Sequence, residues 1–243
     1  MQIIKLNAIG STNEYAKDMA GSYLFKEPVV IWAKNQTAGR GQRGTKWTSK
    51  EGESLTFSIL LRPSQYTIAD QFSISMLVSV AIAEVLNRVQ VPQIKIKWPN
   101  DILADGKKIG GILIENSLKG NQIDSCVIGF GLNVNQTALS EFPKASSLRA
   151  LTGKQYDLEE VLHLLAETII SKLTEFKVAQ KDTLKNEYLS YLFRKDKPSS
   201  FNLDGKKQVP GIIRGIDDHG ALIVQLEDEQ FRTFGLKEIE LLY

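Results

Sequence analysis

The residues between Asn35 and Trp47 combine three glycines with cationic side chains in a way that packing does not explain. Gly39, Gly41 and Gly44 free the backbone to approach another group closely, and the stretch contains no carboxylate. Backbone amides and arginine forks suit a phosphate or a carboxylate, because arginine holds either anion with two parallel hydrogen bonds. The stretch therefore predicts an anion-binding loop, with a solvated surface loop as the alternative.

Three further segments carry polar or glycine-rich sequence that could complete such a site, namely residues 11–13, 97–101 and 108–113. Asp105 and Gly106 form a hairpin turn signal between two apolar stretches, so the residues on either side are expected to pair as antiparallel strands. This pairing predicts that Asn100, Asp101 and Lys108 lie close together. A lysine followed by two glycines in a strand also indicates a close approach to the backbone, and a surface lysine in a hairpin is the alternative.

Taken together, these four segments resemble in order and spacing the motifs of biotin protein ligases, and the loop of glycine and arginine is that family's signature. The resemblance covers essentially the whole chain. It implies a two-step reaction, in which ATP activates biotin as biotinyl-5′-AMP and a lysine of a biotin carboxyl carrier domain, from acetyl-CoA carboxylase or a related carboxylase, then accepts the biotin. It also implies biotin and ATP as substrates, with Mg²⁺ arriving on the nucleotide.

The resemblance assigns a role to each matching residue. The catalytic residues that it implies are Lys108, Arg40 and Asp101. The residues that it implies for biotin binding are Ser11, Thr12, Asn13, Gln36, Gly39, Arg40, Gly41, Gln42, Lys108 and Gly111. Those that it implies for ATP are Arg43, Trp47, Asn100 and Asn133, and none is assigned to a metal. Lys108 is expected to offset the repulsion between the biotin carboxylate and the α-phosphate, and Arg40 is expected to close over the adenylate and exclude water.

Two positions leave details of the mechanism open. Asp101 either deprotonates the incoming lysine amine or orients it, and orientation is the preferred interpretation. Gln42 stands where many family members carry an arginine after Gly41, so this loop has one cation fewer. The departure predicts weaker retention of the adenylate without changing the reaction.

Hydrophobic patterns predict the elements that position these segments. Ser11 followed by Glu14 is a capping-box pattern, which predicts a helix beginning at Thr12. Apolar residues recur at helical spacing over 68–89, as in a long helix packed on a sheet. The segment 129–133 is expected to end its strand in a glycine-rich turn. Strands are expected at 2–6, 28–33, 55–61, 94–97, 102–104, 108–115 and 125–129, and further helices at 157–176 and 182–193.

The pattern changes after residue 194. Residues 194–200 become charged and polar and include Pro198, which predicts a linker. The part that follows is expected to be a small all-β barrel, and the matching part of biotin protein ligases is an SH3-like domain. The β-rich runs that indicate this barrel are 208–214, 221–226 and 231–234.

These elements together predict an α+β fold of the class II synthetase-like, biotin/lipoate ligase type. We expect a mixed or antiparallel sheet packed by helices, followed by the SH3-like barrel. The catalytic domain, which binds biotin and ATP, is assigned to 1–194, and the barrel is assigned to 195–243.

Composition and charge limit the classes of function. The chain has 243 residues, of which 42% are hydrophobic and 24% charged, as in an ordinary soluble globular protein. The net charge of +2 is too small to indicate a nucleic-acid partner, and no DNA-binding domain is expected before Ser11. No apolar run approaches the ~20 residues that cross a bilayer, so we expect no membrane partner and a cytoplasmic location. A homodimer is left open as the oligomeric state.

Two other functions compete with this interpretation. A lipoate or octanoate ligase shares the catalytic architecture, but the glycine and arginine loop together with the segment 97–101 favours biotin. A non-catalytic module that binds biotin or nucleic acid is the other alternative. Single-stranded nucleic acid requires aromatic stacking platforms, and the loop offers Trp47 alone. The presence of Lys108 favours catalysis over biotin sensing.

Overall fold

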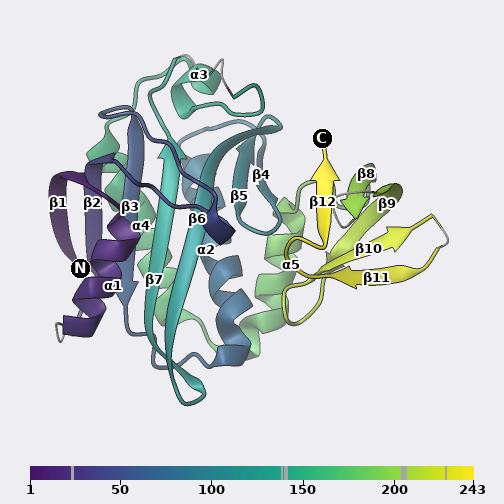
Figure 1. Cartoon of the computed structure of the whole chain (residues 1–243), viewed down its shortest axis with the longest axis horizontal. Coiled ribbons are helices and arrows are strands. Elements are labelled where there is room, and N and C mark those ends of the chain that lie inside the picture. Colours follow the sequence, from purple (N-terminus) through teal and green to yellow (C-terminus); the bar gives the residue numbers. More distant parts are fainter. Residues whose placement is uncertain (23–24, 138, 140–141, 204–206, 228) are drawn as a thin grey trace.

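The computed structural model describes residues 1–22, 25–137, 139, 142–203, 207–227 and 229–243, and this part of the chain forms two sheets with helices around the larger one (Figure 1). The larger sheet has seven strands in the order β1-β2-β3-β7-β6-β5-β4. Its strands are β1 (Gln2–Ile9), β2 (Val29–Gln36), β3 (Ser54–Leu61), β4 (Ile94–Lys97), β5 (Asp101–Ala104), β6 (Lys107–Lys119) and β7 (Gln122–Asn133). β1 and β2 run parallel and the other neighbouring pairs are antiparallel, which confirms the expected mixed sheet.

Helices cover both faces of this sheet (Figure 1). The helices are α1 (Thr12–Ser22), α2 (Gln71–Arg88), α3 (Leu148–Thr152), α4 (Leu158–Glu175) and α5 (Lys181–Tyr191). α1 lies on the near face against β2, β3 and β7, whereas α2 packs on α4 and α5 on the far face. All eight residues of β3 are buried because both of its faces are covered. The sequence did not indicate α3, which is only five residues long.

The helix α2 and the turn before it form the most apolar part of the fold. By length and composition, Ile68–Arg88 would suffice to cross a membrane, so the expectation that the chain has no such run is wrong. Most of this segment is nevertheless buried, and residues such as Ile74 and Leu86 are fully enclosed. A helix that is apolar all round is expected at the centre of a globular core, and α2 occupies that place.

The C-terminal part forms a five-stranded antiparallel sheet in the order β11-β10-β9-β8-β12. Its strands are β8 (Pro198–Leu203), β9 (Lys207–Ile216), β10 (Leu222–Leu226), β11 (Phe231–Phe234) and β12 (Ile239–Leu242). The linker expected at 194–200 is wrong in its second half, because Pro198, Ser199 and Ser200 pair with β9 as part of β8. Serine and proline indicated a loop, but the backbone amides and carbonyls of this segment complete the hydrogen-bonded ladder.

The two sheets share one apolar core. Phe201 of the smaller sheet belongs to the same buried cluster as Ile96 of the larger one. The indole nitrogen of Trp98 donates a hydrogen bond of 2.8 Å to the carbonyl of Gly220. Gly220 has a φ of +85°, and a Cβ added there would lie 2.1 Å from the ring of Phe72. The smaller sheet is therefore packed closely against the turn between β4 and β5.

The strand β7 is longer than expected. It continues through Asn133 instead of ending in a turn at 129–133. A Cβ added at Gly129 would lie 2.1 Å from Asn13 Oδ1, and one added at Gly131 would lie 2.2 Å from Trp47 Cε2. These glycines therefore mark the close approach of other side chains to the strand, and the expected turn is wrong.

Glu187 on α5 gives a prediction about the stability of the helical layer. Lys172 Nζ lies 2.8 Å from Glu84 Oε1 and 3.9 Å from Glu187 Oε1. Burial, together with a hydrogen bond to Glu84, raises the pKa of Glu187 above its usual value. A raised carboxyl pKa stabilises the fold at low pH, and this contribution is lost as the pH rises through that pKa.

We therefore expect Glu187→Gln to raise the melting temperature at neutral pH by about 1–2 °C, the shift for roughly 0.5 kcal/mol of relieved repulsion between partly exposed carboxylates. In acid, where Glu187 is protonated, the variant should have the same melting temperature as the parent. Circular dichroism at both pH values measures the effect, and Glu51→Gln, in an exposed turn, is the matched control. A loss of stability at neutral pH would show that the charge of Glu187 is favourable through Lys172.

Candidate active site

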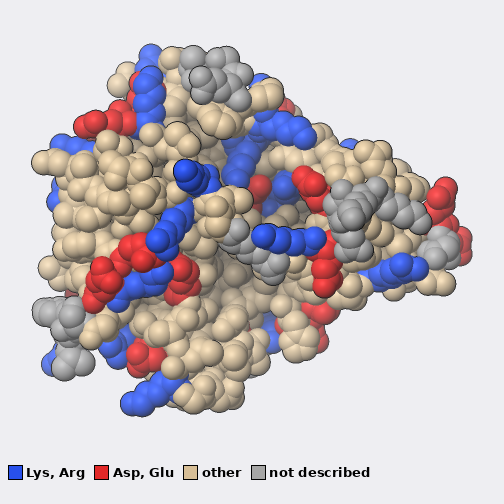
Figure 2. All heavy atoms as spheres, viewed as in Figure 1, with Lys and Arg blue, Asp and Glu red and all other residues tan. Residues whose placement is uncertain are grey.

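A cavity of about 510 Å³ lies between the larger sheet and the C-terminal sheet. Its walls come from the loop after β2, the turn between β4 and β5, the strands β6 and β7, and residues around β12. Lysine and arginine side chains gather around the hollow on this face (Figure 2). The cavity is thus concave and carries cationic side chains, which suit an anionic ligand.

The loop of glycine and arginine is folded back on itself. Arg40 and Lys46 form a β-bridge, and Gly41 N donates to Thr45 O at 2.7 Å. A Cβ at Gly39 would lie 2.4 Å from Trp47 O, and one at Gly41 would lie 2.4 Å from Thr45 Oγ1. Both glycines are therefore needed for the loop's own turn, and this turn places the short 3₁₀ helix Gln42–Gly44 at the cavity.

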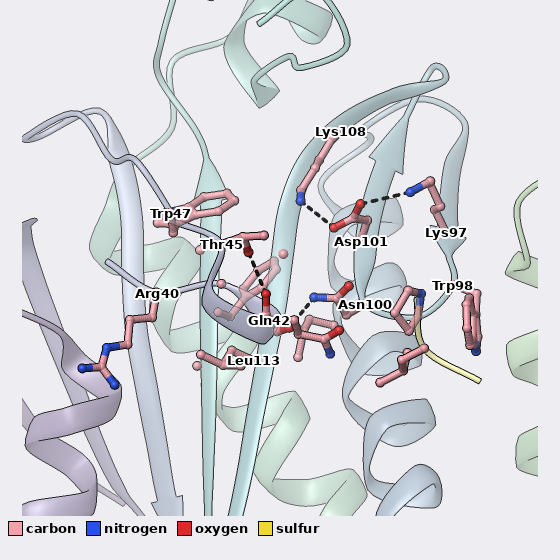
Figure 3. A pocket seen from close by; sticks show the side chains of 18 of the residues that line it. Arg40, Gln42, Thr45, Trp47, Lys97, Trp98, Asn100, Asp101, Lys108 and Leu113 are labelled. Atoms are coloured by element: carbon pink, nitrogen blue, oxygen red, sulfur yellow. Dashed lines mark hydrogen bonds and ion pairs between the residues drawn. The ribbon is translucent and has the colours of Figure 1, made fainter. Parts of the chain in front are cut away.

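Arg40 does not point at the centre of the cavity. Its Nη1 lies 2.7 Å from Glu14 Oε1 on α1, and its side chain is 58% exposed. In Figure 3 the guanidinium extends away from Lys108 and Asp101. A hydrogen bond from Lys17, with Arg40 nearby, holds the pKa of Glu14 below its usual value. Glu14 is thus bound to two cations, in place of the reciprocal capping contact expected for it.

Lys108 and Asp101 meet as the hairpin predicted. Lys108 Nζ lies 2.6 Å from Asp101 Oδ1, and Lys97 Nζ lies 3.5 Å from Asp101 Oδ2 (Figure 3). The backbone of Lys108 is fixed by a second segment, since its N–H donates to Lys144 O at 2.7 Å and its carbonyl accepts from Ser146 N at 2.9 Å. The sequence indicated the first pair. It placed Lys97 in a site segment without giving it a role, and it did not indicate the segment that anchors Lys108.

A polar network occupies the end of the cavity near α1. Thr12 N donates to Gln36 Oε1 at 2.8 Å, and Ser58 Oγ lies 2.7 Å from Thr12 Oγ1 and 2.6 Å from Asn13 Oδ1. Ser11, Thr12, Asn13 and Gln36 all line the cavity, as expected. Ser58 is a serine inside an apolar strand and is fully buried. The sequence alone gave no reason to connect Ser58 with residues 46 and 45 positions earlier.

Trp47 packs against glycines of the central strands. Its indole packs on Gly131, and Lys108 Nζ lies 6.0 Å from the centre of its ring. The indole nitrogen is buried without a hydrogen-bond partner among the described residues. Gly111 is also close, because a Cβ there would lie 3.5 Å from the same ring. The glycines of β6 and β7 therefore leave room for Trp47, and of these strand glycines the sequence had assigned only Gly111 to the site.

The remaining assigned residues differ in their placement. Asn100 lines the cavity, and its Nδ2 donates to Ile112 O at 2.8 Å. Asn133 does not line it, because its amide is buried and bonds to Ser146 O at 3.0 Å. Gly39 lines a neighbouring hollow of about 640 Å³ behind the loop. The side chain of Arg43 lies outside the described part of the structure.

The C-terminal sheet contributes a wall that the sequence did not predict. Asn202, Lys237 and Glu240 line the cavity together with Trp98 from the larger sheet. Trp98 belongs to the predicted segment 97–101, but no motif in the sequence links Asn202, Lys237 or Glu240 to the glycine and arginine loop. They reach the site because the two sheets pack together through Trp98 and Gly220.

Comparison with known proteins identifies the family to which this cavity belongs. The model of the biotin/lipoate A/B protein ligase family matches residues 6–133, and the model of the biotin protein ligase C-terminal domain matches residues 201–239. The second match is to a domain that is named for biotin protein ligases. The chain belongs to the biotin protein ligase family.

Individual biotin protein ligases support this assignment over nearly the whole chain. The bifunctional ligase/repressor BirA of Escherichia coli is 32% identical over 227 residues, which cover 90% of this chain and 68% of the relative. The biotin–[acetyl-CoA-carboxylase] ligase of Paracoccus denitrificans is 32% identical over 222 residues, which cover 88% of this chain and 90% of the relative. The biotin protein ligase of Aquifex aeolicus, solved with biotin and ATP, aligns with a TM-score of 0.81 at 27% identity, covering 99% of this chain and 98% of that chain.

As a biotin protein ligase the protein is an enzyme, and the alternative of a non-catalytic binding module is wrong. The expected α+β fold is confirmed, and the second antiparallel sheet corresponds to the SH3-like C-terminal domain of the family.

Proposed function

We propose that this enzyme activates biotin with ATP as biotinyl-5′-AMP and transfers the biotin to a lysine of a biotin carboxyl carrier domain. The observation that supports this most strongly is one cavity that joins the polar network of α1, the glycine and arginine loop and the Lys108–Asp101 pair. The Aquifex aeolicus ligase, solved with biotin and ATP, supports these two substrates. Transfer to a carboxylase carrier is supported by the name of the Paracoccus denitrificans relative.

In the first step, an oxygen of the biotin carboxylate forms a bond to the α-phosphorus of ATP, and the bond to the bridging oxygen breaks to release pyrophosphate. Two anions must approach each other, and a fixed cation between them lowers that barrier. Lys108 lies in the cavity wall, and its ammonium is 2.6 Å from Asp101 Oδ1. Ser11, Thr12, Asn13 and Gln36 would hold the polar end of biotin, with Ser58 fixing the orientation of Thr12 and Asn13.

In the second step, the neutral amine of the carrier lysine attacks the acyl carbon, the bond from that carbon to the phosphate oxygen breaks, and AMP leaves while the amine loses one proton. Asp101 is 14% exposed and is held by two lysines. One oxygen of this carboxylate faces Lys108 and the other faces Lys97, so Asp101 already binds ammonium groups. Asp101 therefore suits the orientation of the incoming ammonium better than its deprotonation.

The loop would close over the adenylate and exclude water. Arg40 would leave Glu14 for this purpose, and the exposure of the Arg40–Glu14 pair makes the exchange inexpensive. Trp47 and Asn100 would bind the nucleotide. The sequence assigns Arg43 and Asn133 to nucleotide binding as well. The contacts of Asn133 give it the indirect task of fixing Ser146 beside Lys108.

Mg²⁺ would neutralise charge on the triphosphate when bound. The acidic side chains that line the described cavity are Asp101 and Glu240. Asp101 already holds two lysines, which fits an ion bound mainly by phosphate oxygens and water.

We further assign the catalytic unit to 1–194 and the barrel to 195–243. We also assign the enzyme a cytoplasmic location, with a homodimer as one candidate assembly.

Gln42 gives a prediction about retention of the intermediate. It lines the cavity at the start of the 3₁₀ helix in the loop, and an uncharged amide binds a phosphate more weakly than a guanidinium does. We expect Gln42→Arg to slow the release of preformed biotinyl-adenylate by about tenfold, as roughly 1.4 kcal/mol of added binding would do. The release rate without carrier is the measurement, with Gln155→Arg in an exposed loop as control. An unchanged rate would place the Gln42 side chain away from the intermediate.

The transfer step is tested by mass spectrometry of a purified carrier domain incubated with enzyme, biotin and ATP. We expect one biotin per carrier and none on a carrier whose acceptor lysine is replaced by arginine. Modification of the arginine variant at the same rate would show that the adenylate escapes and reacts in solution, and no modification of either carrier would contradict the proposed acceptor.

A further inference from the structure

Lys97 is a cation of the cavity to which the proposed reaction gives no role. It ends β4 and pairs in register with Asp101 across the β4–β5 hairpin. Its Nζ lies 3.5 Å from Asp101 Oδ2, while Lys108 Nζ lies 2.6 Å from Oδ1. Each oxygen of this carboxylate therefore faces one lysine. The Lys97 side chain is 19% exposed and that of Lys108 is 36% exposed, so Lys97 is the more enclosed of the two.

Aromatic residues hold Lys97 from another direction. Its Nζ lies 5.3 Å from the centre of the Tyr243 ring, a distance at which an ammonium is attracted to an aromatic face. Tyr243 packs edge-to-face on Phe193 with 5.3 Å between the ring centres. Phe193 N in turn donates to Ile96 O at 2.8 Å, next to Lys97 in β4. Lys97 is thus fixed between a carboxylate and a ring that follows β12 of the smaller sheet.

Lys108 must change partners during the proposed reaction. It is bound to Asp101 in the structure, so an approach to the biotin carboxylate and the α-phosphate requires it to leave. Asp101 is only 14% exposed, and a poorly solvated carboxylate is costly to leave without a counter-ion. Lys97 already faces its second oxygen and has no need to move.

We propose that Lys97 is a positioning residue that neutralises Asp101 when Lys108 turns to the substrates, and that it thereby frees Lys108 for adenylation. The inference rests on the proposed role of Lys108. It also gives the C-terminal sheet a part in the first step, because Tyr243 holds Lys97 beside Asp101. Lys97 acts in this account through Asp101 and touches neither biotin nor ATP.

A double-mutant cycle tests this role by biotin-dependent exchange of labelled pyrophosphate into ATP. Lys97→Met is expected to lower the exchange rate by about tenfold, the factor that 1.4 kcal/mol represents, because Asp101 then retains Lys108. In the double variant that combines Lys97→Met with Asp101→Asn, no carboxylate is left to retain Lys108. The double variant is therefore expected to exchange faster than Lys97→Met and at the rate of Asp101→Asn alone. Lys97→Arg keeps the charge and is expected to recover most of the loss.

Two results would overturn the inference. One is exchange by Lys97→Met at the parent rate. The other is a double variant that exchanges as slowly as Lys97→Met. This second result would show that Lys97 acts on the substrates or on folding. If Lys97→Met loses its cooperative melting transition, Lys97→Gln replaces it in the same cycle. The proposed function fails separately, since a parent enzyme without biotin-dependent exchange contradicts that function whatever the Lys97 variants do.

Discussion

Lys108→Ala is expected to lower biotin-dependent exchange of pyrophosphate into ATP by about 10²–10³-fold, the loss typical of removing one group that stabilises developing charge. The ammonium of Lys108 would otherwise stand between the biotin carboxylate and the α-phosphate. The fold is expected to survive, because the side chain is 36% exposed and Asp101 keeps Lys97 as its ion-pair partner. Thermal melting of the variant checks this second point.

Lys107→Ala is the matched control for this substitution. Lys107 is the preceding residue of β6 and is exposed, so its loss is expected to leave exchange at the parent rate. If Lys108→Ala forms biotinyl-adenylate as fast as Lys107→Ala, Lys108 serves only as a structural partner of Asp101 and the proposed first step loses its cation.

Gly131→Ala is expected to lower the same exchange by about 10-fold to 100-fold. The added Cβ would lie 2.2 Å from Trp47 Cε2, and overpacking of this kind costs typically about 1–3 kcal/mol. The indole is the movable partner, because Gly131 lies in a strand hydrogen-bonded on both sides. Trp47 would therefore leave the floor of the cavity and take the end of the glycine and arginine loop with it.

Gly21→Ala adds the same methyl group where nothing lies within 4 Å, so exchange and melting temperature should stay near those of the parent. Quenching of tryptophan fluorescence by acrylamide reports whether the indole of Trp47 has moved into solvent in Gly131→Ala. Parent-like exchange together with parent-like quenching would show that the strand yields instead of the ring, and that Trp47 does not depend on this glycine.

Local patterns predicted the elements well where the chain has strong periodicity. The apolar run of β3 and the helical spacing of α2 each specify one element, because burial on both sides leaves little choice of face. β8 was less predictable, since Pro198, Ser199 and Ser200 are typical of loops. They form a strand because β9 and β12 lie on either side of β8, and that arrangement depends on residues far along the chain.

The site was predicted as a set of motifs, but its contacts depend on packing. The hairpin signal brought Asp101 to Lys108, because that contact is local in sequence. Arg40 was assigned to the ligand on the absence of acids in its own loop, and Glu14 from α1 binds it in the structure. The contact of Lys97 with Tyr243 joins residues from two sheets, and no sequence pattern records such a pair.

The most direct test of the central claim is exchange of labelled pyrophosphate into ATP by the purified enzyme, measured with biotin, with lipoate, with octanoate and with no added acid. Exchange reports reversible formation of the acyl-adenylate, so it needs no carrier protein. The cavity around Lys108 is predicted to support exchange with biotin and to give the acid-free background with lipoate and octanoate. Exchange driven by lipoate or octanoate in the absence of biotin, or no exchange with biotin by the folded parent enzyme, would contradict the account.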